Sequence, residues 1–198
     1  MIYIIILNRK YCKCCIMTSV SDGRKERETD MGANWIVREA VETDETAVRC
    51  IYNTCQAQGT WAEGNRKYTQ QSIHSFFCRH KEQGEPLLVA QADGHVAGFA
   101  LLWEFREWKT EEKTMEYAVY TDPDWRRQGV ASLLLEAVKE QAEACGAVAL
   151  MACIDIRNLP SLWFHENRGF TSTGSFTKWK KDGSPGDVFF TYRYKILT

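Results

Sequence analysis

The chain has 198 residues, of which 44% are hydrophobic and 26% are charged, and its formal net charge is −1. This length suits one domain with its own core, and the near-neutral charge argues against a nucleic-acid-binding protein. No apolar run approaches the roughly 18 residues that cross a bilayer, so we expect no membrane partner. The eight cysteines are irregularly spaced, which favours reduced thiols in a cytoplasmic protein over a disulfide scaffold.

The first thirty residues differ in composition from the rest of the chain. They combine a short apolar tip at 2–7, a cluster of cysteines and a lysine at 12–15 and a charged stretch at 22–30. This order is not that of a signal peptide, and no second cysteine or histidine pair follows at metal-binding spacing. We expect residues 1–33 to be a disordered extension and residues 34–198 to form a single domain.

From residue 35 onward, the pattern alternates between strands and helices. Short apolar runs predict strands, and apolar residues at helical spacing after a capping residue predict helices. Thr43 and Thr69 are the expected caps of the first two helices, and Asp93-Gly94 is a hairpin signal. In chain order we expect a strand at 35–39, helices at 44–58 and 70–84, strands at 87–92, 96–103 and 115–121, a helix at 130–145, a strand at 148–154, a short helix at 160–168, and strands at 170–179 and 188–196. This order predicts a mixed α/β fold with one central sheet covered by helices.

The segment between a predicted strand and the helix at 130–145 carries the clearest functional signal. It reads Arg126-Arg127-Gln128-Gly129-Val130-Ala131. The first N–H groups of a helix lack intrahelical partners and carry partial positive charge, so they bind phosphates. Gly129 and Ala131 allow close approach to the backbone, and the arginines add charge. The segment is not a Walker loop, because no Gly-Lys-Ser/Thr occurs, and it is not a Rossmann fingerprint, because the three-glycine spacing is missing. On its own, the motif also fits an ordinary solvated helix start.

Together with a second motif, this segment resembles a known superfamily. Arg126-x-x-Gly129-x-Ala131, after a strand and before an amphipathic helix, resembles the acyl-CoA pyrophosphate motif of the GCN5-related N-acetyltransferases (GNAT). The run Asn158-x-Pro160-Ser161-x-x-x-His165-Glu166-x-x-Gly169-Phe170 resembles the second motif of that superfamily. Within it, the match is best to the phosphinothricin/methionine sulfoximine acetyltransferase-like branch, and the likeness runs from about residue 35 to residue 196.

The resemblance implies the GNAT-type fold, a mostly antiparallel, splayed sheet of about seven strands flanked by about four helices. The strands at 115–121 and 148–155 would separate, and the pantetheine arm of acetyl-CoA would lie between them. The cofactor-binding residues that the resemblance implies are Val119, Tyr120, Thr121, Arg127, Gln128, Gly129, Val130, Ala131, Ser132, Asn158 and Asn167. Among these, Val119 and Thr121 would pair with pantetheine through their backbone.

Glu116 and His165 are the candidate catalytic residues. An amine attacks a thioester only when its nitrogen is unprotonated, so a carboxylate that takes up a proton is a useful base. Glu116 matches the carboxylate of the family, although its position alone also fits an exposed strand residue. His165 stands where many members of the superfamily have a tyrosine that protonates the leaving thiolate. We expect His165 to contact substrate, carry a proton or shape the site; the alternative is a helix histidine bonded to a nearby carbonyl or carboxylate.

Aromatic and basic residues from several segments are candidates for the substrate pocket. Trp61, Arg106 and Trp108 are the preferred ones, because aromatic walls with an arginine suit a small amino acid with an anionic head. The same residues also fit surface loops or a dimer interface. We expect no metal, because no ligand cluster is evident, and no cysteine nucleophile, because no cysteine has a convincing histidine and oxyanion context. The remaining histidines, at 74, 80 and 95, are expected to be structural or solvated.

The predicted activity is direct transfer of acetyl from acetyl-CoA to the α-amine of a small amino acid or analogue. Polyamines, aminoglycosides and protein N-termini are the alternative amines, and a non-catalytic acyl-CoA sensor is the alternative class. The expected partners are the small-molecule amine and a second copy of the chain in a homodimer.

Overall fold

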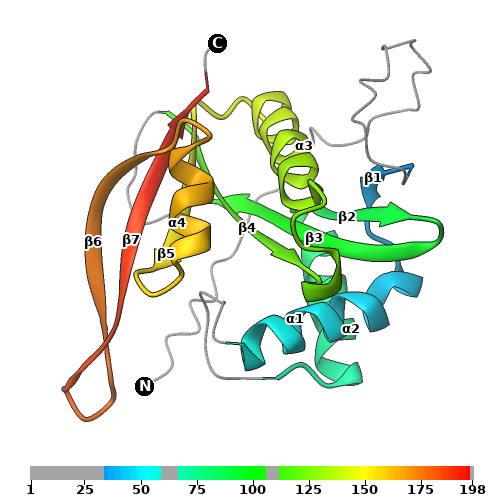
Figure 1. Ribbon diagram of the computed structural model, residues 1–198, viewed down its shortest axis with the longest axis horizontal. Coiled ribbons are helices and arrows are strands. Elements are labelled where there is room, and N and C mark those ends of the chain that lie inside the picture. Colours follow the sequence, from blue (N-terminus) through cyan, green and yellow to red (C-terminus); the bar gives the residue numbers. More distant parts are fainter. Residues whose placement is uncertain (1–33, 59–66, 106–111, 197–198) are drawn as a thin grey trace.

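The computed structural model describes residues 34–58, 67–105 and 112–196. They form one seven-stranded sheet with helices on both faces (Figure 1). The elements follow the order that the sequence predicts. They are β1 (Ile36–Glu39), a 3-10 turn η1 (Glu42–Asp44), α1 (Glu45–Ala57), α2 (Gln70–Gln83), β2 (Leu87–Ala92), β3 (His95–Glu104), β4 (Thr114–Thr121), a 3-10 turn η2 (Pro123–Trp125), α3 (Val130–Ala144), β5 (Ala149–Asp155), α4 (Leu159–Glu166), β6 (Thr171–Trp179) and β7 (Pro185–Lys195).

The sheet consists of two antiparallel halves joined by one parallel seam. The strand order is β1-β2-β3-β4-β5-β7-β6, and β4–β5 is its parallel pair. This pairing covers three positions and ends at Glu116 opposite Met151, although β4 continues to Thr121 and β5 to Asp155. The two strands therefore part after Glu116, and the splayed sheet that the resemblance implies is confirmed.

The parting leaves one edge of β4 facing a gap. The N–H of Phe105 donates to the carbonyl of Thr114, and the N–H of Asp122 donates to that of Ala97, both at 2.9 Å. The β3–β4 register between these two bonds is unbroken. Backbone groups of an antiparallel strand alternate in direction, so even-numbered residues of β4 bond to β3. The odd-numbered residues, Val119 among them, point their N–H and C=O groups toward the gap.

Two apolar clusters cover the two faces of the sheet. One joins α3 to the sheet through Leu134, Leu135 and Leu150, and α4 packs against the same cluster. The other joins α1 and α2 to the opposite face through Ile51 and Ile73. Figure 1 shows the same division, with α1 and α2 on one side of β3 and β4 and with α3 on the other. Odd-numbered residues of β4 thus face α3 and α4, and even-numbered residues face α1 and α2.

One predicted cap is confirmed and one is wrong. Thr69 caps α2, since its hydroxyl accepts a hydrogen bond from the N–H of Ser72 at 3.2 Å. Thr43 was expected to cap α1, but it lies inside η1, and Asp44 precedes the helix instead. The reason is tertiary: the carboxylate of Asp44 accepts from the N–H of Val41 at 2.8 Å and from the guanidinium of Arg38 at 2.7 Å.

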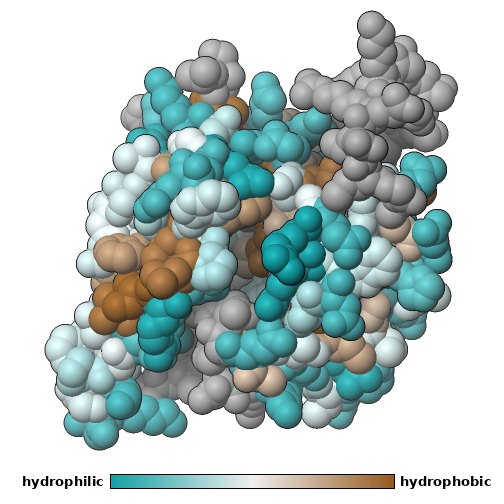
Figure 2. Space-filling model, in the orientation of Figure 1, coloured by the Kyte–Doolittle hydropathy of each residue, from teal (hydrophilic) through white to brown (hydrophobic). Residues whose placement is uncertain are grey.

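Apolar side chains are also exposed on the β5–β7–β6 half. Leu159 and Trp163, four residues apart on α4, are each 67% exposed, and Figure 2 shows an apolar patch at the position of α4. Strand β6 is an edge strand whose residues are almost all exposed, including Phe176 and Trp179. Within the described ranges, no helix is both long enough and apolar enough to cross a bilayer.

Candidate active site

The turn between η2 and α3 has the geometry of an anion site. Arg127 and Gly129 both adopt left-handed backbone conformations, with φ of 61° and 82°, and Gly129 is the residue that precedes α3. The N–H of Ser132 bonds back to the carbonyl of Gly129 at 2.9 Å. Val130 and Ala131 begin the helix, and their N–H groups have no intrahelical acceptor. A turn of this kind directs several N–H groups toward one point and attracts an anion.

Gly98 on β3 sets how closely α3 approaches the sheet. A Cβ atom at this position would lie 2.8 Å from the carbonyl oxygen of Tyr120, 2.9 Å from Cγ1 of Val130 and 3.1 Å from Cδ1 of Leu134. Such separations are shorter than normal contacts between carbon atoms. The missing side chain therefore lets the first turn of α3 lie directly against β3 and the end of β4.

Three arginines surround this turn. Arg126 donates to Oε1 of Gln58 at 2.7 Å, so its guanidinium is directed toward the end of α1. Arg168, just after α4, donates to the hydroxyl of Ser132 and stacks 3.8 Å above the ring centroid of Phe164. Arg127 is exposed. The start of α3 is thus tied to the end of α4, and Arg127 is the arginine available to a ligand at the turn.

Glu116 is the last residue of β4 that pairs with β5. Its side chain is half-buried, and its Oε2 atom accepts a hydrogen bond from Nε1 of Trp103 at 3.1 Å. Trp103 is also its cross-strand partner on β3. As an even-numbered residue, Glu116 lies on the face that α1 and α2 cover. The carboxylate is therefore held by an indole N–H at the point where the gap begins.

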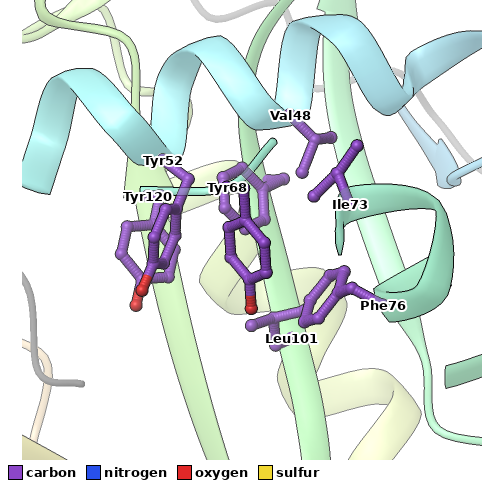
Figure 3. Close-up of a pocket in the computed structure, with 8 residues that line it drawn as sticks. Val48, Tyr52, Tyr68, Ile73, Phe76, Leu101 and Tyr120 are labelled. Carbon is purple, nitrogen blue, oxygen red and sulfur yellow. The ribbon is translucent and has the colours of Figure 1, made fainter. Parts of the chain in front are cut away.

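A small aromatic cavity lies on the same face of the sheet. Its volume is about 30 Å³, which is room for a few water molecules. Figure 3 shows the hydroxyl groups of Tyr52, Tyr68 and Tyr120 pointing to the same side, the one on which Leu101 lies. The next β3 residue on this face is Trp103. The lining residues are Val48, Tyr52, Tyr68, Ile73, Phe76, Phe99, Leu101 and Tyr120.

His165 lies on the opposite face from Glu116. It is buried, and its ring packs against those of Tyr117 and Phe170 at centroid distances of 5.8 and 5.1 Å. Its Nδ1 atom lies 2.6 Å from the carbonyl oxygen of Ser161, so Nδ1 carries the proton. Burial lowers the pKa of His165, the Ser161 carbonyl opposes that shift and Arg168 adds to it. The structure does not bring the two candidate catalytic residues together, and the carbonyl-bonded alternative describes the position of His165.

The other predicted cofactor residues lie on β4 and at the two ends of α4. Val119 borders the gap through its backbone, as does Thr121, whose carbonyl also accepts from Sγ of Cys55 at 3.4 Å. Tyr120 stacks on Phe99 with its ring in the α1–α2 layer, so neither its side chain nor its backbone faces the gap. Asn158 caps α4 through a bond from the N–H of Ser161 at 3.2 Å.

Asn167, the last of the predicted cofactor residues, lies at the C-terminal end of α4. The side chain of Asn167 donates to the carbonyl of Trp163 at 2.8 Å. Trp61, Arg106 and Trp108 lie outside the described residues. Sequence reasoning missed Gly98 and Arg168. A lone glycine inside an apolar strand is a signal for close backbone approach, whereas nothing in the local sequence pairs Arg168 with α3.

Comparison with known proteins agrees with this architecture. Residues 46–170 match the model of the acetyltransferase (GNAT) family. The L-methionine sulfoximine/L-methionine sulfone acetyltransferase of Pseudomonas paraeruginosa is 30% identical over 139 residues, which are 70% of this chain and 81% of that protein. The L-amino acid N-acyltransferase MnaT of Escherichia coli is 28% identical over 137 residues, which are 69% of this chain and 80% of that protein.

A solved structure extends the similarity to the whole domain. The N-acetyltransferase of Staphylococcus aureus Mu50 has a TM-score of 0.74 and 29% identity, covering 82% of this chain and 98% of that one. The fold, the parted strands and the turn before α3 thus define an acetyltransferase architecture. The chain belongs to the acetyltransferase (GNAT) family, and it is an enzyme of the N-acetyltransferase class.

Proposed function

We propose that the protein transfers acetyl from acetyl-CoA to the α-amine of a small amino acid or analogue, of the methionine sulfoximine or phosphinothricin type. The observation that carries the proposal is the parting of β4 and β5 directly after Glu116. A carboxylate, a free strand edge and an anion-binding turn thereby border one gap. The relatives named for L-methionine sulfoximine and L-amino acids support the choice of amine.

In this proposal, acetyl-CoA binds along β4 and at the start of α3. The gap-facing groups of Val119 and Thr121 pair with the amides of the pantetheine arm, as another strand would. The close approach at Gly98 and the left-handed turn fit a pyrophosphate on the α3 N–H groups. Asn158 and Asn167 contact the cofactor from the two ends of α4, and Tyr120 supports β4 from the α1–α2 layer. The turn residues that bind the pyrophosphate are Arg127, Gln128, Gly129, Val130, Ala131 and Ser132.

Glu116 acts as the base, directly or through one water molecule. It accepts the proton of the ammonium group, which frees the lone pair for attack on the thioester carbonyl. The C–N bond forms, and backbone N–H groups of the parted strand stabilise the oxyanion. The C–S bond then breaks, and the departing thiolate takes up the second proton that the nitrogen loses. Trp103 holds the carboxylate in position through its hydrogen bond. His165 shapes the reacting centre from the other face of β4.

Replacement of Glu116 by Gln tests the proposal. We expect turnover to fall by about 10²-fold or more near neutral pH, and by less at high pH, where the amine is already deprotonated. Thiol release from acetyl-CoA over a range of pH measures this, and calorimetry should show unchanged coenzyme A affinity. Glu104→Gln, an exposed carboxylate on the neighbouring strand, is the control. A pH–rate profile identical to that of the wild type would remove Glu116 as the base.

A panel of amines tests the substrate class. Methionine sulfoximine, phosphinothricin and free amino acids should release coenzyme A fastest, ahead of polyamines, aminoglycosides and peptide N-termini. Tight acetyl-CoA binding without thiol release by any amine would contradict the enzyme and favour the sensor alternative.

We also propose that the protein acts as a cytoplasmic homodimer. The exposed apolar residues of β6 and α4 support an interface on this half of the sheet, because exposed apolar patches often mark sites of protein association. Among the described residues, the cysteines at 50, 55, 78, 145 and 153 form no disulfide, the state that a reducing compartment favours. Light scattering should give twice the chain mass, and Trp179→Lys should reduce it; a wild-type monomer at micromolar concentration would contradict the dimer.

A further inference from the structure

Three side chains on helices α1 and α2 form a hydrogen-bonded series that the proposed reaction does not use. Oε1 of Glu45 lies 2.7 Å from Nδ1 of His74, and Nε2 of the same ring lies 3.6 Å from Sγ of Cys78. Glu45 begins α1 and is buried, whereas Cys78 lies one turn after His74 on α2 and is exposed. A buried carboxylate, an imidazole and an accessible thiol are therefore connected in series.

The hydrogen bonds determine the direction in which a proton moves along this series of side chains. A carboxylate only accepts, so Nδ1 of His74 carries the ring proton and Nε2 is left as an acceptor facing the thiol. Nε2 of Gln70 donates to the other oxygen of Glu45 at 3.2 Å, which holds the carboxylate in place. A carboxylate oxygen of Glu42, a carboxylate oxygen of Glu45 and a ring nitrogen of His74 lie within 4.8 Å of one another. Two carboxylates thus lie close to the imidazole of His74.

We propose that Cys78 is a reactive thiol that exchanges with low-molecular-weight disulfides, with His74 as its general base and Glu45 as a positioning residue. Nε2 of His74 takes the thiol proton as Sγ attacks one sulfur of the disulfide. A new S–S bond forms at Sγ, the S–S bond of the reagent breaks, and the departing thiolate takes the proton from His74. Cys78 is oxidised to a mixed disulfide, and half of the reagent is reduced to a thiol.

Cys50 provides a control inside the same molecule. It is also exposed on a helix, α1, and no hydrogen bond links it to a histidine in the part of the chain that the structure describes. Steric access alone therefore predicts similar reactivity for the two thiols. The imidazole contact predicts that Cys78 reacts faster, by about tenfold or more.

Site-resolved exchange with 2,2′-dithiodipyridine measures the difference on the full chain. Samples quenched at short times, in the presence of a chelator, are digested, and mass spectrometry follows the peptides that hold Cys78 and Cys50. A Cys78 rate at least tenfold above that of Cys50 supports the proposal. Equal rates in the wild-type protein overturn it without the need for any variant.

Two substitutions separate the base from its positioning residue. His74→Asn, whose side chain is too short to reach the thiol, should lower the Cys78 rate to that of Cys50 and leave the Cys50 rate unchanged. Glu45→Gln keeps a hydrogen-bond acceptor but removes the charge, so the Cys78 rate should fall part of the way. Thermal melting of each variant identifies a general loss of structure, which would raise both rates together. A Cys78 rate that survives His74→Asn in a folded protein also overturns the proposal.

Discussion

Gly98→Ala tests whether the position of α3 controls cofactor binding. The added methyl would lie 2.8 Å from a backbone oxygen of β4 and 2.9 Å from a methyl of Val130. Carbon atoms prefer separations of about 3.5–4.0 Å, so the start of α3 must move away from β3 by about 0.5–1 Å. Overpacking of this kind costs about 1–3 kcal/mol of unfolding free energy. The N–H groups before Ser132 move with the helix, and we expect the Kd for coenzyme A to rise by about tenfold.

Urea unfolding and calorimetric titration with coenzyme A measure the two effects. Gly146→Ala is the control, because Gly146 follows α3 at φ 73° and no atom lies within 4 Å of the methyl it would gain. It should lose about 1–2 kcal/mol through backbone strain and bind coenzyme A normally. Wild-type coenzyme A affinity in Gly98→Ala, at reduced stability, would refute the idea that this approach positions the binding turn.

Two further substitutions probe the turn before α3 and the aromatic rings around His165. Arg127→Gly removes a left-handed non-glycine residue (φ 61°) and a positive charge. Unfolding free energy should therefore rise by about 0.5–1 kcal/mol, and coenzyme A binding should weaken and depend less on salt. Unchanged binding at low salt would contradict the role of Arg127. Burial holds the pKa of His165 below 6.5, so its stabilising contribution is present above pH 6.5 and is lost as the pH falls through the folded-state pKa. His165→Gln should flatten the loss of stability as the pH falls below 6.5, which amounts to at most about 1.4 kcal/mol per pH unit for one group. The same slope in both proteins, measured by urea unfolding, would show that other groups titrate there.

The sequence predicts the local features of this fold well because they depend on neighbouring residues. The order of strands and helices, the cap at Thr69 and the glycine turn before α3 all follow from short patterns. Thr43 is the counterexample. Its neighbour Asp44 is drawn into the bond with Arg38, a residue of β1 whose position depends on tertiary packing.

The relative placement of the site residues depends on packing that no local pattern contains. Glu116 and His165 both match family motifs, but the face on which each lies depends on the layer to which its neighbours belong. The i, i+4 spacing of His74 and Cys78 is visible in the sequence. Glu45, which lies 29 residues before His74, joins them only because α1 packs on α2.

The three-position pairing of β4 with β5 joins the two halves of the sheet by few backbone hydrogen bonds. Each half of the sheet keeps its own antiparallel ladder, and the halves are otherwise joined by the apolar cluster under α3 and α4 and by the hydrogen bond from Arg168 to Ser132. A ligand that bonds to β4 and also contacts α4 would add a further link between the two halves. The amide protons of Val119 and Thr121, which face the gap, should therefore exchange slowly with solvent deuterium when coenzyme A is bound, and quickly when it is absent.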